Sequence, residues 1–185
     1  MYRKIICFGD SNTWGYDPRG PLGDRYEKIW PDLLEKILKN AVINWGENGL
    51  EIPTSTITFP LDMDLLIIML GTNDLLEGKN AEDVCKKMEV FLMQQALEYQ
   101  KVLLIVPPAL KVGAWVQNTA LVRESAILAD SYRELSERLN THFIDAGQWN
   151  LDLAFDGVHL TEEAHERFAE NLSSFLNSLQ TNAGL

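Results

Sequence analysis

Residues 65–70 read Leu65-Leu66-Ile67-Ile68-Met69-Leu70, an uninterrupted run of apolar side chains. The run is too short for a core helix, and its continuous apolar character is typical of a strand buried on both faces of a parallel sheet. Other short apolar runs, mostly bounded by Gly, Asp or Pro, occur at Lys4–Phe8, Ala41–Trp45, Val102–Val106 and His142–Ile144. The sequence therefore predicts five strands.

Longer amphipathic stretches alternate with these runs. Helical periodicity is found over about Tyr26–Lys39, Asn80–Tyr99, Thr119–Leu139 and Thr161–Leu179. Strands that alternate with helices are typical of a parallel sheet covered by helices on both faces. We therefore expect an α/β protein, a three-layer α/β/α sandwich with a mostly parallel five-stranded sheet of flavodoxin-like order. The length of 185 residues suits one core, so residues 1–185 are expected to form a single domain.

Two polar clusters come directly after the first and third predicted strands. They are Gly9-Asp10-Ser11-Asn12 and Gly71-Thr72-Asn73-Asp74. In open parallel sheets, ligands bind beyond the carboxyl ends of the strands, at the point where the strand order reverses. In a flavodoxin-like order that point lies between the first and third strands. The sequence therefore predicts a functional site at these two clusters.

The charge balance excludes some classes of partner. The chain carries 27 acidic and 16 basic residues, which gives a net charge of -11 and argues against a nucleic-acid-binding surface. No apolar stretch has the length of a membrane span or a secretory signal. The two cysteines, Cys7 and Cys85, are more typical of free thiols than of a disulfide or metal site. We expect a cytoplasmic protein without a nucleic-acid or membrane partner, and the sequence gives no indication of an oligomeric state.

Ser11 is a candidate nucleophile, and such a serine needs a base within hydrogen-bond reach. Of the three histidines, His142 opens a predicted strand and His165 lies inside the last predicted helix, where structural or surface roles are more common. His159 differs because it lies on the loop that precedes this helix. It is therefore the candidate base.

The loop sequence Phe155-Asp156-Gly157-Val158-His159-Leu160 also supplies a carboxylate. A turn with Gly between Asp and His can bring both side chains to one side, so that the carboxylate orients the imidazole and stabilises its cation. The alternative is that Asp156 and Gly157 only form a turn and His159 helps to start the helix.

Acyl transfer also needs donors directed at the developing oxyanion. The side-chain amide of Asn73, the backbone N–H of Gly49 and the backbone N–H of Ser11 are candidates. Each also has an ordinary explanation, with Gly49 as a turn residue and Asn73 as a helix cap.

Together, four stretches resemble the conserved blocks of the SGNH hydrolase superfamily, also called GDSL esterases and lipases: residues 9–15, 46–49, 70–74 and 156–161. The resemblance implies Ser11 as nucleophile, His159 as base and Asp156 as its orienting acid. It also implies an oxyanion hole formed by the Ser11 N–H, Gly49 and Asn73, with Gly46 as an alternative to Gly49. Asn12 departs from the leucine of the name GDSL.

Neither a metal nor a cofactor is expected. Asp10, Asp74 and Asp156 could be imagined as a site for a hard cation, but Asp10 and Asp74 are better explained as hydrogen-bonding the turns that hold Ser11 and Asn73. No phosphate-binding loop, Cys-x-x-Cys pair or His-Glu-x-x-His helix occurs. The sequence also lacks Gly-x-Ser-x-Gly, which disfavours the other common esterase fold.

Further stretches are similar to the small bacterial arylesterase and acyltransferase branch: Ile6-Cys7-Phe8, Val106-Pro107-Pro108 and residues 143–147. Members of this branch act on short acyl esters, some transfer the acyl group to alcohols, and some related enzymes deacetylate sugars. The resemblance implies a serine ester hydrolase that acts on a small-molecule ester through an acyl-enzyme, with acyltransferase activity as an option. The alternatives are a carbohydrate O-deacetylase and a non-catalytic carbohydrate-binding module on the same fold.

The loops expected around the site are short, at residues 16–25, 110–118 and 148–155. Short loops favour an open site over the lidded site of a long-chain lipase. Trp14 and Trp115 lie on such loops, where they either shape an acyl or aryl pocket or pack in the core.

Overall fold

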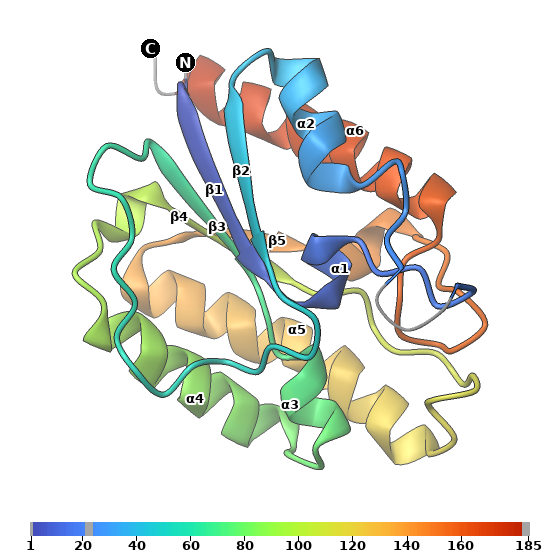
Figure 1. The fold of residues 1–185 in the computed structure, drawn as a ribbon. Coiled ribbons are helices and arrows are strands. Elements are labelled where there is room, and N and C mark those ends of the chain that lie inside the picture. The colour runs from blue at the N-terminus through green and yellow to red at the C-terminus, as the bar shows by residue number, and fades with distance from the viewer. Residues whose placement is uncertain (1, 21–23, 183–185) are drawn as a thin grey trace.

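The computed structural model describes residues 2–20 and 24–182 (Figure 1). Five strands form one sheet in the order β2-β1-β3-β4-β5, and all the pairings are parallel. The strands are β1 (Lys4–Gly9), β2 (Ala41–Gly46), β3 (Leu65–Met69), β4 (Val102–Val106) and β5 (His142–Asp145). The predicted α/β sandwich of flavodoxin-like order is confirmed, with a sheet that is fully rather than mostly parallel.

Helices cover both faces of the sheet, as Figure 1 shows. One face carries α2 (Trp30–Leu38) and α6 (Glu162–Asn182), and the other carries α4 (Ala81–Gln94) and α5 (Thr119–Leu139). Two short helices, α1 (Ser11–Trp14) and α3 (Thr72–Leu76), directly follow β1 and β3, and the 3-10 turns η1 (Tyr99–Lys101) and η2 (Ala146–Trp149) flank β4 and β5. None of the helices in the described part of the chain is long and apolar enough to cross a membrane.

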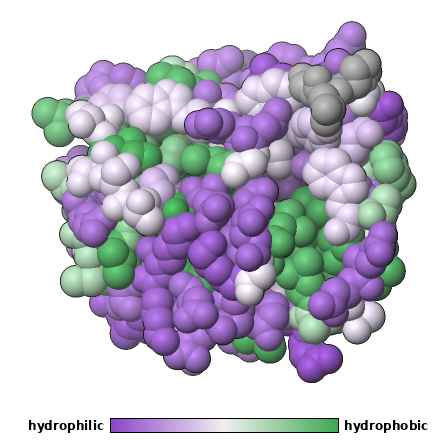
Figure 2. Space-filling model, turned by 60° about the horizontal axis from the view of Figure 1, so that its bottom comes forward, coloured by the Kyte–Doolittle hydropathy of each residue, from purple (hydrophilic) through white to green (hydrophobic). Residues whose placement is uncertain are grey.

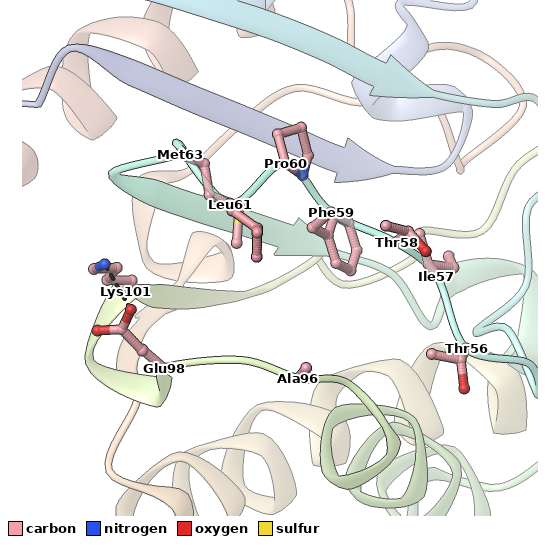
Figure 3. Close-up of a pocket in the computed structure, with 10 residues that line it drawn as sticks. All are labelled: Thr56, Ile57, Thr58, Phe59, Pro60, Leu61, Met63, Ala96, Glu98 and Lys101. Carbon is pink, nitrogen blue, oxygen red and sulfur yellow. Dashed lines mark hydrogen bonds and ion pairs between the residues drawn. The ribbon is translucent and has the colours of Figure 1, made fainter.

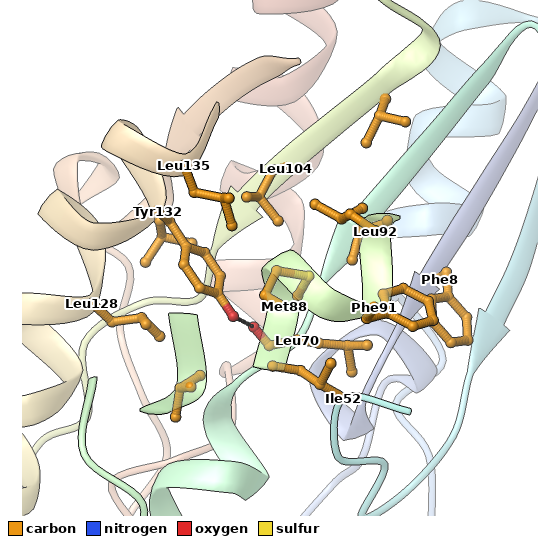
Figure 4. Packing of buried hydrophobic residues seen from close by; sticks show 14 of the residues in the cluster. Phe8, Ile52, Leu70, Met88, Phe91, Leu92, Leu104, Leu128, Tyr132 and Leu135 are labelled. Carbon is orange, nitrogen blue, oxygen red and sulfur yellow. Dashed lines mark hydrogen bonds between the residues drawn. The ribbon is translucent and has the colours of Figure 1, made fainter. Parts of the chain in front are cut away.

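The sheet divides the interior into two hydrophobic cores. Alternate β3 side chains point to opposite faces, so that Leu66 and Ile68 pack in the core under α4 and α5, whereas Ile67 packs under α2 and α6. Figure 4 shows the first core, where Phe91 of α4 lies against Phe8 of β1. Burial on both faces explains why the β3 sequence is apolar at every position.

The ends of two helices differ from the prediction. The helix expected from Tyr26 begins only at Trp30, with Pro31 in its first turn, where the missing N–H of proline is not needed. The helix expected to reach Tyr99 ends at Gln94. There the buried side chain of Gln95 accepts a hydrogen bond from the Ile57 N–H, and the backbone of Gln95 is extended. A contact with a distant loop therefore ends the helix.

β1 and β3 lie side by side, so their carboxyl ends place α1 next to α3. Gly9 closes β1 at a position where a Cβ atom would lie 2.1 Å from Thr13 Oγ1 and 2.8 Å from the Met69 carbonyl oxygen. Only glycine allows the chain to turn into α1 so close to β3. The predicted polar clusters therefore meet at one edge of the sheet.

Polar residues fill the centre of the face that Figure 2 presents, and hydrophobic residues show in smaller patches on either side of it. Such a distribution is ordinary for a protein surface.

Tyr132 of α5 offers a test of the packing between α5 and β3. Its side chain is fully buried and its hydroxyl donates a 3.2 Å hydrogen bond to the Leu70 carbonyl oxygen (Figure 4). Tyr132→Phe leaves this carbonyl without its partner, and we expect the free energy of unfolding to fall by about 1–2 kcal/mol in urea denaturation. The control is Tyr99→Phe, because the half-buried Tyr99 makes only a 3.5 Å contact with the Leu92 carbonyl oxygen. Tyr99→Phe should lower the free energy of unfolding by no more than about 0.5 kcal/mol. Equal losses in the two variants would contradict this account.

Candidate active site

Ser11 is the first residue of α1. Asp10 caps this helix by accepting a 2.9 Å hydrogen bond from the Asn12 N–H, and Gly15 ends it in a left-handed conformation with φ of 98°. The backbone N–H groups in the first turn of a helix have no partner within the helix. The turn after β1 therefore presents both the hydroxyl and the N–H of Ser11 at the carboxyl edge of the sheet.

The structure brings Ser11 together with Asp156 and His159, which lie near the other end of the chain. His159 Nε2 is 2.9 Å from Ser11 Oγ, and His159 Nδ1 is 2.6 Å from Asp156 Oδ2. Gly157, with φ of 81°, makes the turn that places the carboxylate and the imidazole on one side. His165, by contrast, is buried in α6 away from this chain of hydrogen bonds, and His142 lies on β5.

Asp156 is held as a carboxylate by its partners. Burial raises the pKa of this carboxyl, but hydrogen bonds from the His159 ring and from the N–H groups of Val158 and His159 outweigh burial and lower the pKa below its usual range. A carboxylate that accepts from Nδ1–H fixes the imidazole orientation and leaves Nε2 as an acceptor facing Ser11.

A pocket of about 410 Å³ opens above Ser11 and His159. The lining combines polar residues with apolar and aromatic ones. Besides Ser11 and His159, the lining residues are Tyr16, Asn48, Gly49, Asn73, Leu76, Trp115 and Val158. Both predicted donors, Gly49 and Asn73, thus lie at this pocket. The Asn73 amide donates a 3.0 Å hydrogen bond to the Leu50 carbonyl oxygen, which fixes its orientation.

Gly49 and Gly46, the two alternatives for the oxyanion-hole glycine, have different surroundings. Gly46 is packed against α1, since a Cβ atom there would lie 2.2 Å from the Trp14 nitrogen, and its N–H donates to Asn44 Oδ1 at 2.8 Å. Gly49 has φ of 76° and open space on its Cβ side. The structure therefore places Gly49, and not Gly46, at the pocket.

Two aromatic rings flank His159. The Tyr16 ring centroid lies 4.6 Å from the imidazole centroid, and the Trp115 ring stands nearly perpendicular to the imidazole at 5.2 Å. Trp115 was a sequence candidate for the pocket, whereas Tyr16 was not. Trp14, the other candidate, instead lies near the Arg25 guanidinium and does not line the pocket.

Asp10 and Asp74 have unequal roles. Asp10 holds the Ser11 turn as expected, and burial raises the pKa of its carboxyl to about 6 although the hydrogen bond from Asn12 favours the ionised form. The Asp74 side chain was expected to hydrogen-bond the Asn73 turn, but it binds other groups. Its oxygens accept from the Ile52 N–H at 2.9 Å and from Lys87 Nζ at 2.6 Å. Asp74 therefore anchors the loop that follows β2.

The anchor of this loop is an ion network that the sequence did not reveal. Glu51, on the same loop, pairs with Lys79 and with Lys87, each at 2.8 Å. Lys79 also lies 3.6 Å from Asp74. Within residues 2–20 and 24–182, no group of three or more His, Cys, Asp or Glu residues is arranged to hold a metal ion.

A second hollow, of about 190 Å³, lies at the opposite end of the sheet, where β3 and β4 begin (Figure 3). Its only charged lining residues, Glu98 and Lys101, pair with each other at 2.8 Å. The remaining lining residues include Phe59, Leu61 and Met63, and none is a histidine, serine or cysteine. This hollow therefore offers no counterpart of the hydrogen-bonded Ser11, His159 and Asp156.

Comparison with known proteins shows the family of the chain. The family model described as the GDSL-like Lipase/Acylhydrolase family matches residues 7–167. The chain belongs to this family. It is accordingly an esterase or acylhydrolase of the GDSL type. No curated protein matches the chain in sequence.

Solved structures of family esterases share the fold over nearly their whole length. The native aryl esterase of M. smegmatis is 26% identical with a TM-score of 0.82, and the alignment covers 96% of this chain and 99% of that chain. A carbohydrate acetylesterase family member from Sinorhizobium meliloti is 27% identical with a TM-score of 0.74, covering 95% and 98%. The lipase/acylhydrolase from Enterococcus faecalis, 22% identical with a TM-score of 0.71, covers 95% and 96% and shows likeness of fold alone.

The raised pKa of Asp10 predicts a pH-dependent effect of Asp10→Asn. The folded state binds the Asp10 proton more tightly than the unfolded state, so the stabilisation is present below about pH 4 and is lost as the pH rises through about 6. From pH 4 to 7, the free energy of unfolding of Asp10→Asn should therefore rise relative to wild type by about 3 kcal/mol. Urea denaturation of both proteins at several pH values measures this difference, and a constant difference over the range would contradict it.

Lys87 should matter far more for stability than its neighbour Lys86. Lys87→Met removes the main cation beside the fully buried Asp74, and we expect a loss of about 2–3 kcal/mol, reduced from the full cost of a buried pair because Lys87 is partly exposed. Lys86→Met is the matched control, since the exposed Lys86 pairs only with the exposed Glu82. Its free energy of unfolding should stay close to that of wild type, because solvent screens an exposed pair. Denaturation of both variants at low salt makes the comparison, and similar losses would show that the network does not hold Asp74.

Proposed function

We propose that the protein is a serine ester hydrolase that cleaves short-chain acyl esters through an acyl-enzyme intermediate. The observation that carries this proposal is the continuous chain of hydrogen bonds from Asp156 through His159 to Ser11, with contacts of 2.6 and 2.9 Å, at the floor of an open pocket. Ser11 is the nucleophile, His159 is the general base and Asp156 orients the imidazole.

In the first half of the reaction, Ser11 Oγ attacks the ester carbonyl carbon while its proton moves to His159 Nε2. Asp156 stabilises the imidazolium that forms. As the tetrahedral intermediate collapses, the bond to the leaving oxygen breaks and His159 gives its proton to the leaving alcohol. In the second half, His159 takes a proton from a water molecule, which attacks the acyl carbonyl carbon. The bond between this carbon and Ser11 Oγ then breaks, His159 returns the proton to Ser11 Oγ, and the acid is released. An alcohol in place of water gives acyl transfer. The mechanism needs neither a metal nor a cofactor.

The oxyanion is held by the N–H groups of Ser11 and Gly49 and by the Asn73 amide. Neither backbone N–H donates to an acceptor within residues 2–20 and 24–182. The Asn73 amide uses one hydrogen on Leu50 and keeps the second for the pocket. Donors that are fixed in advance stabilise the developing charge without reorganisation during the reaction, and one such donor is worth about 10²–10³ in rate.

The openness of the pocket supports small substrates. Trp115, from the loop at residues 110–118, lines the pocket and is 52% exposed, and no residue of the loop at 148–155 lines it. Residues 21–23 of the loop at 16–25 lie outside the described residues. The apolar lining residues Trp115, Val158 and Leu76 suit an aryl or short acyl group.

A carbohydrate O-deacetylase is the second candidate. The polar lining residues Asn48 and Asn73 offer amide groups to sugar hydroxyls, and a carbohydrate acetylesterase family member is among the similar structures. A non-catalytic binding module would have no need for the hydrogen-bonded Ser11, His159 and Asp156. We also propose that residues 1–185 form a single domain, because both hydrophobic cores pack against the two faces of one sheet.

Replacement of Ser11 tests the proposal. Ser11→Ala should lower kcat on 4-nitrophenyl acetate by about 10⁴ or more, because the nucleophile is lost while folding is unaffected. The control is Ser136→Ala, since the buried Ser136 hydroxyl donates only to the Tyr132 carbonyl oxygen within α5. This variant should keep wild-type turnover.

Turnover by folded Ser11→Ala within tenfold of wild type would overturn the assignment. The same assay on acetylated sugars separates the two candidate activities, because a higher kcat/KM on sugars than on aryl esters favours the deacetylase.

A further inference from the structure

Asn12 follows the proposed nucleophile directly and is only 2% exposed. Its side-chain amide reaches across to the loop that carries His159. Nδ2 donates to the Val158 carbonyl oxygen at 3.1 Å, and Oδ1 accepts from the Leu160 N–H at 2.8 Å. The two partners are the residues immediately before and after His159.

This pair of hydrogen bonds fixes more than a single contact could. An amide bound through both its donor and its acceptor to the backbone on either side of His159 restricts both the position and the tilt of that backbone. His159 Nε2 must lie within hydrogen-bond distance of Ser11 Oγ, and displacements of about 1 Å in such arrangements reduce rates by about 100-fold. The two hydrogen bonds of the Asn12 amide therefore help to set the distance between His159 Nε2 and Ser11 Oγ, across which the proton moves.

Asn12 is itself held from the opposite side. Its carbonyl oxygen accepts from the Trp30 indole N–H at 3.0 Å, and its N–H donates to Asp10. The backbone N–H of Trp30 donates to His165 Nδ1 at 3.3 Å. Burial lowers the pKa of His165 to about 3, which keeps this ring neutral as an acceptor. The amide thus projects from a backbone that is tied to β1, α2 and α6.

We propose that Asn12 is a positioning residue whose side-chain amide holds His159 at hydrogen-bond distance from Ser11. This inference rests on the proposed function. Asn12 itself lies outside the pocket lining, so it acts through His159 rather than on the substrate.

Asn12→Leu and Asn12→Ser test the proposal. Leucine makes neither hydrogen bond, and serine, which is smaller and fits the same space, makes at most one. Because the substrate pocket is unchanged while the imidazole is freer, kcat on 4-nitrophenyl acetate should fall by about 10–100-fold and KM should change by less than about threefold.

Gln95→Met is the matched control for a general loss of stability. Gln95 is also buried, and its amide also joins two backbone groups, the Phe91 carbonyl oxygen at 2.9 Å and the Ile57 N–H at 2.8 Å. These contacts lie beside the hollow at the far end of the sheet, so this variant should lose stability but keep wild-type kcat.

Proton NMR gives a readout that needs no turnover. The Nδ1–H proton between His159 and Asp156, in a 2.6 Å hydrogen bond, should give a far-downfield resonance in wild type. We expect this resonance to shift upfield or broaden in both Asn12 variants and to stay unchanged in Gln95→Met.

Folded Asn12 variants with kcat within twofold of wild type and an unchanged resonance would overturn the proposal. So would an equal loss of kcat in Gln95→Met. If wild type shows no Ser11-dependent turnover, the proposed function fails, and the NMR comparison still decides whether Asn12 holds His159.

Discussion

β1 and β3 lie side by side in parallel, with Gly9 opposite Met69 at their carboxyl ends. Because the strands run in the same direction, the chain leaves both at one edge of the sheet, and α1 and α3 begin there next to each other (Figure 1). Two polar groups of the proposed site depend directly on this pairing. Ser11 is the first residue of α1 and Asn73 lies in the first turn of α3, so a change of strand order would separate them. The site is therefore a consequence of sheet topology before it is a matter of individual side chains.

Two loops complete the site, and separate polar contacts hold them. The loop with His159 is tied to α1 through the amide of Asn12. The loop with Gly49 is tied to α3 and α4 through Asp74, Lys87 and their neighbours. Each loop thus has its own attachment to the helices that follow the central strands. A polar site assembled from four segments needs such attachments, because the groups must keep their geometry to within fractions of an ångström.

The site also contains three buried carboxyl groups, and each is compensated differently. Asp156 has three donors, which outweigh burial and keep it ionised. Asp74 is paired with a lysine. Asp10 has a single backbone donor, and burial raises its pKa to about 6. Only the first arrangement gives a carboxylate that faces a histidine, which is why Asp156, rather than its neighbours in the fold, suits the orienting role.

The sequence predicts the strands and the candidate site residues better than the hydrogen bonds and ion pairs between distant segments. Strand β3 was recognisable because burial on both faces demands an apolar run, and Ser11, Asn73 and His159 were recognisable because they follow core elements. The contacts of Asn12, Lys87 and Gln95 were not, because each joins segments that are far apart in the chain and leaves no local pattern. The same holds for the early end of α4, where tertiary contact overrides helix periodicity.

The central claim is that Ser11 is a nucleophile activated by His159. Labelling with a fluorophosphonate, followed by intact mass on wild type, Ser11→Ala and His159→Ala, tests it most directly because the reagent reports the nucleophile without any choice of substrate. The account predicts one adduct on wild type, none on the folded Ser11 variant and much slower labelling of the His159 variant. Absence of an adduct on folded wild type, or equal labelling of the Ser11 variant, would contradict it.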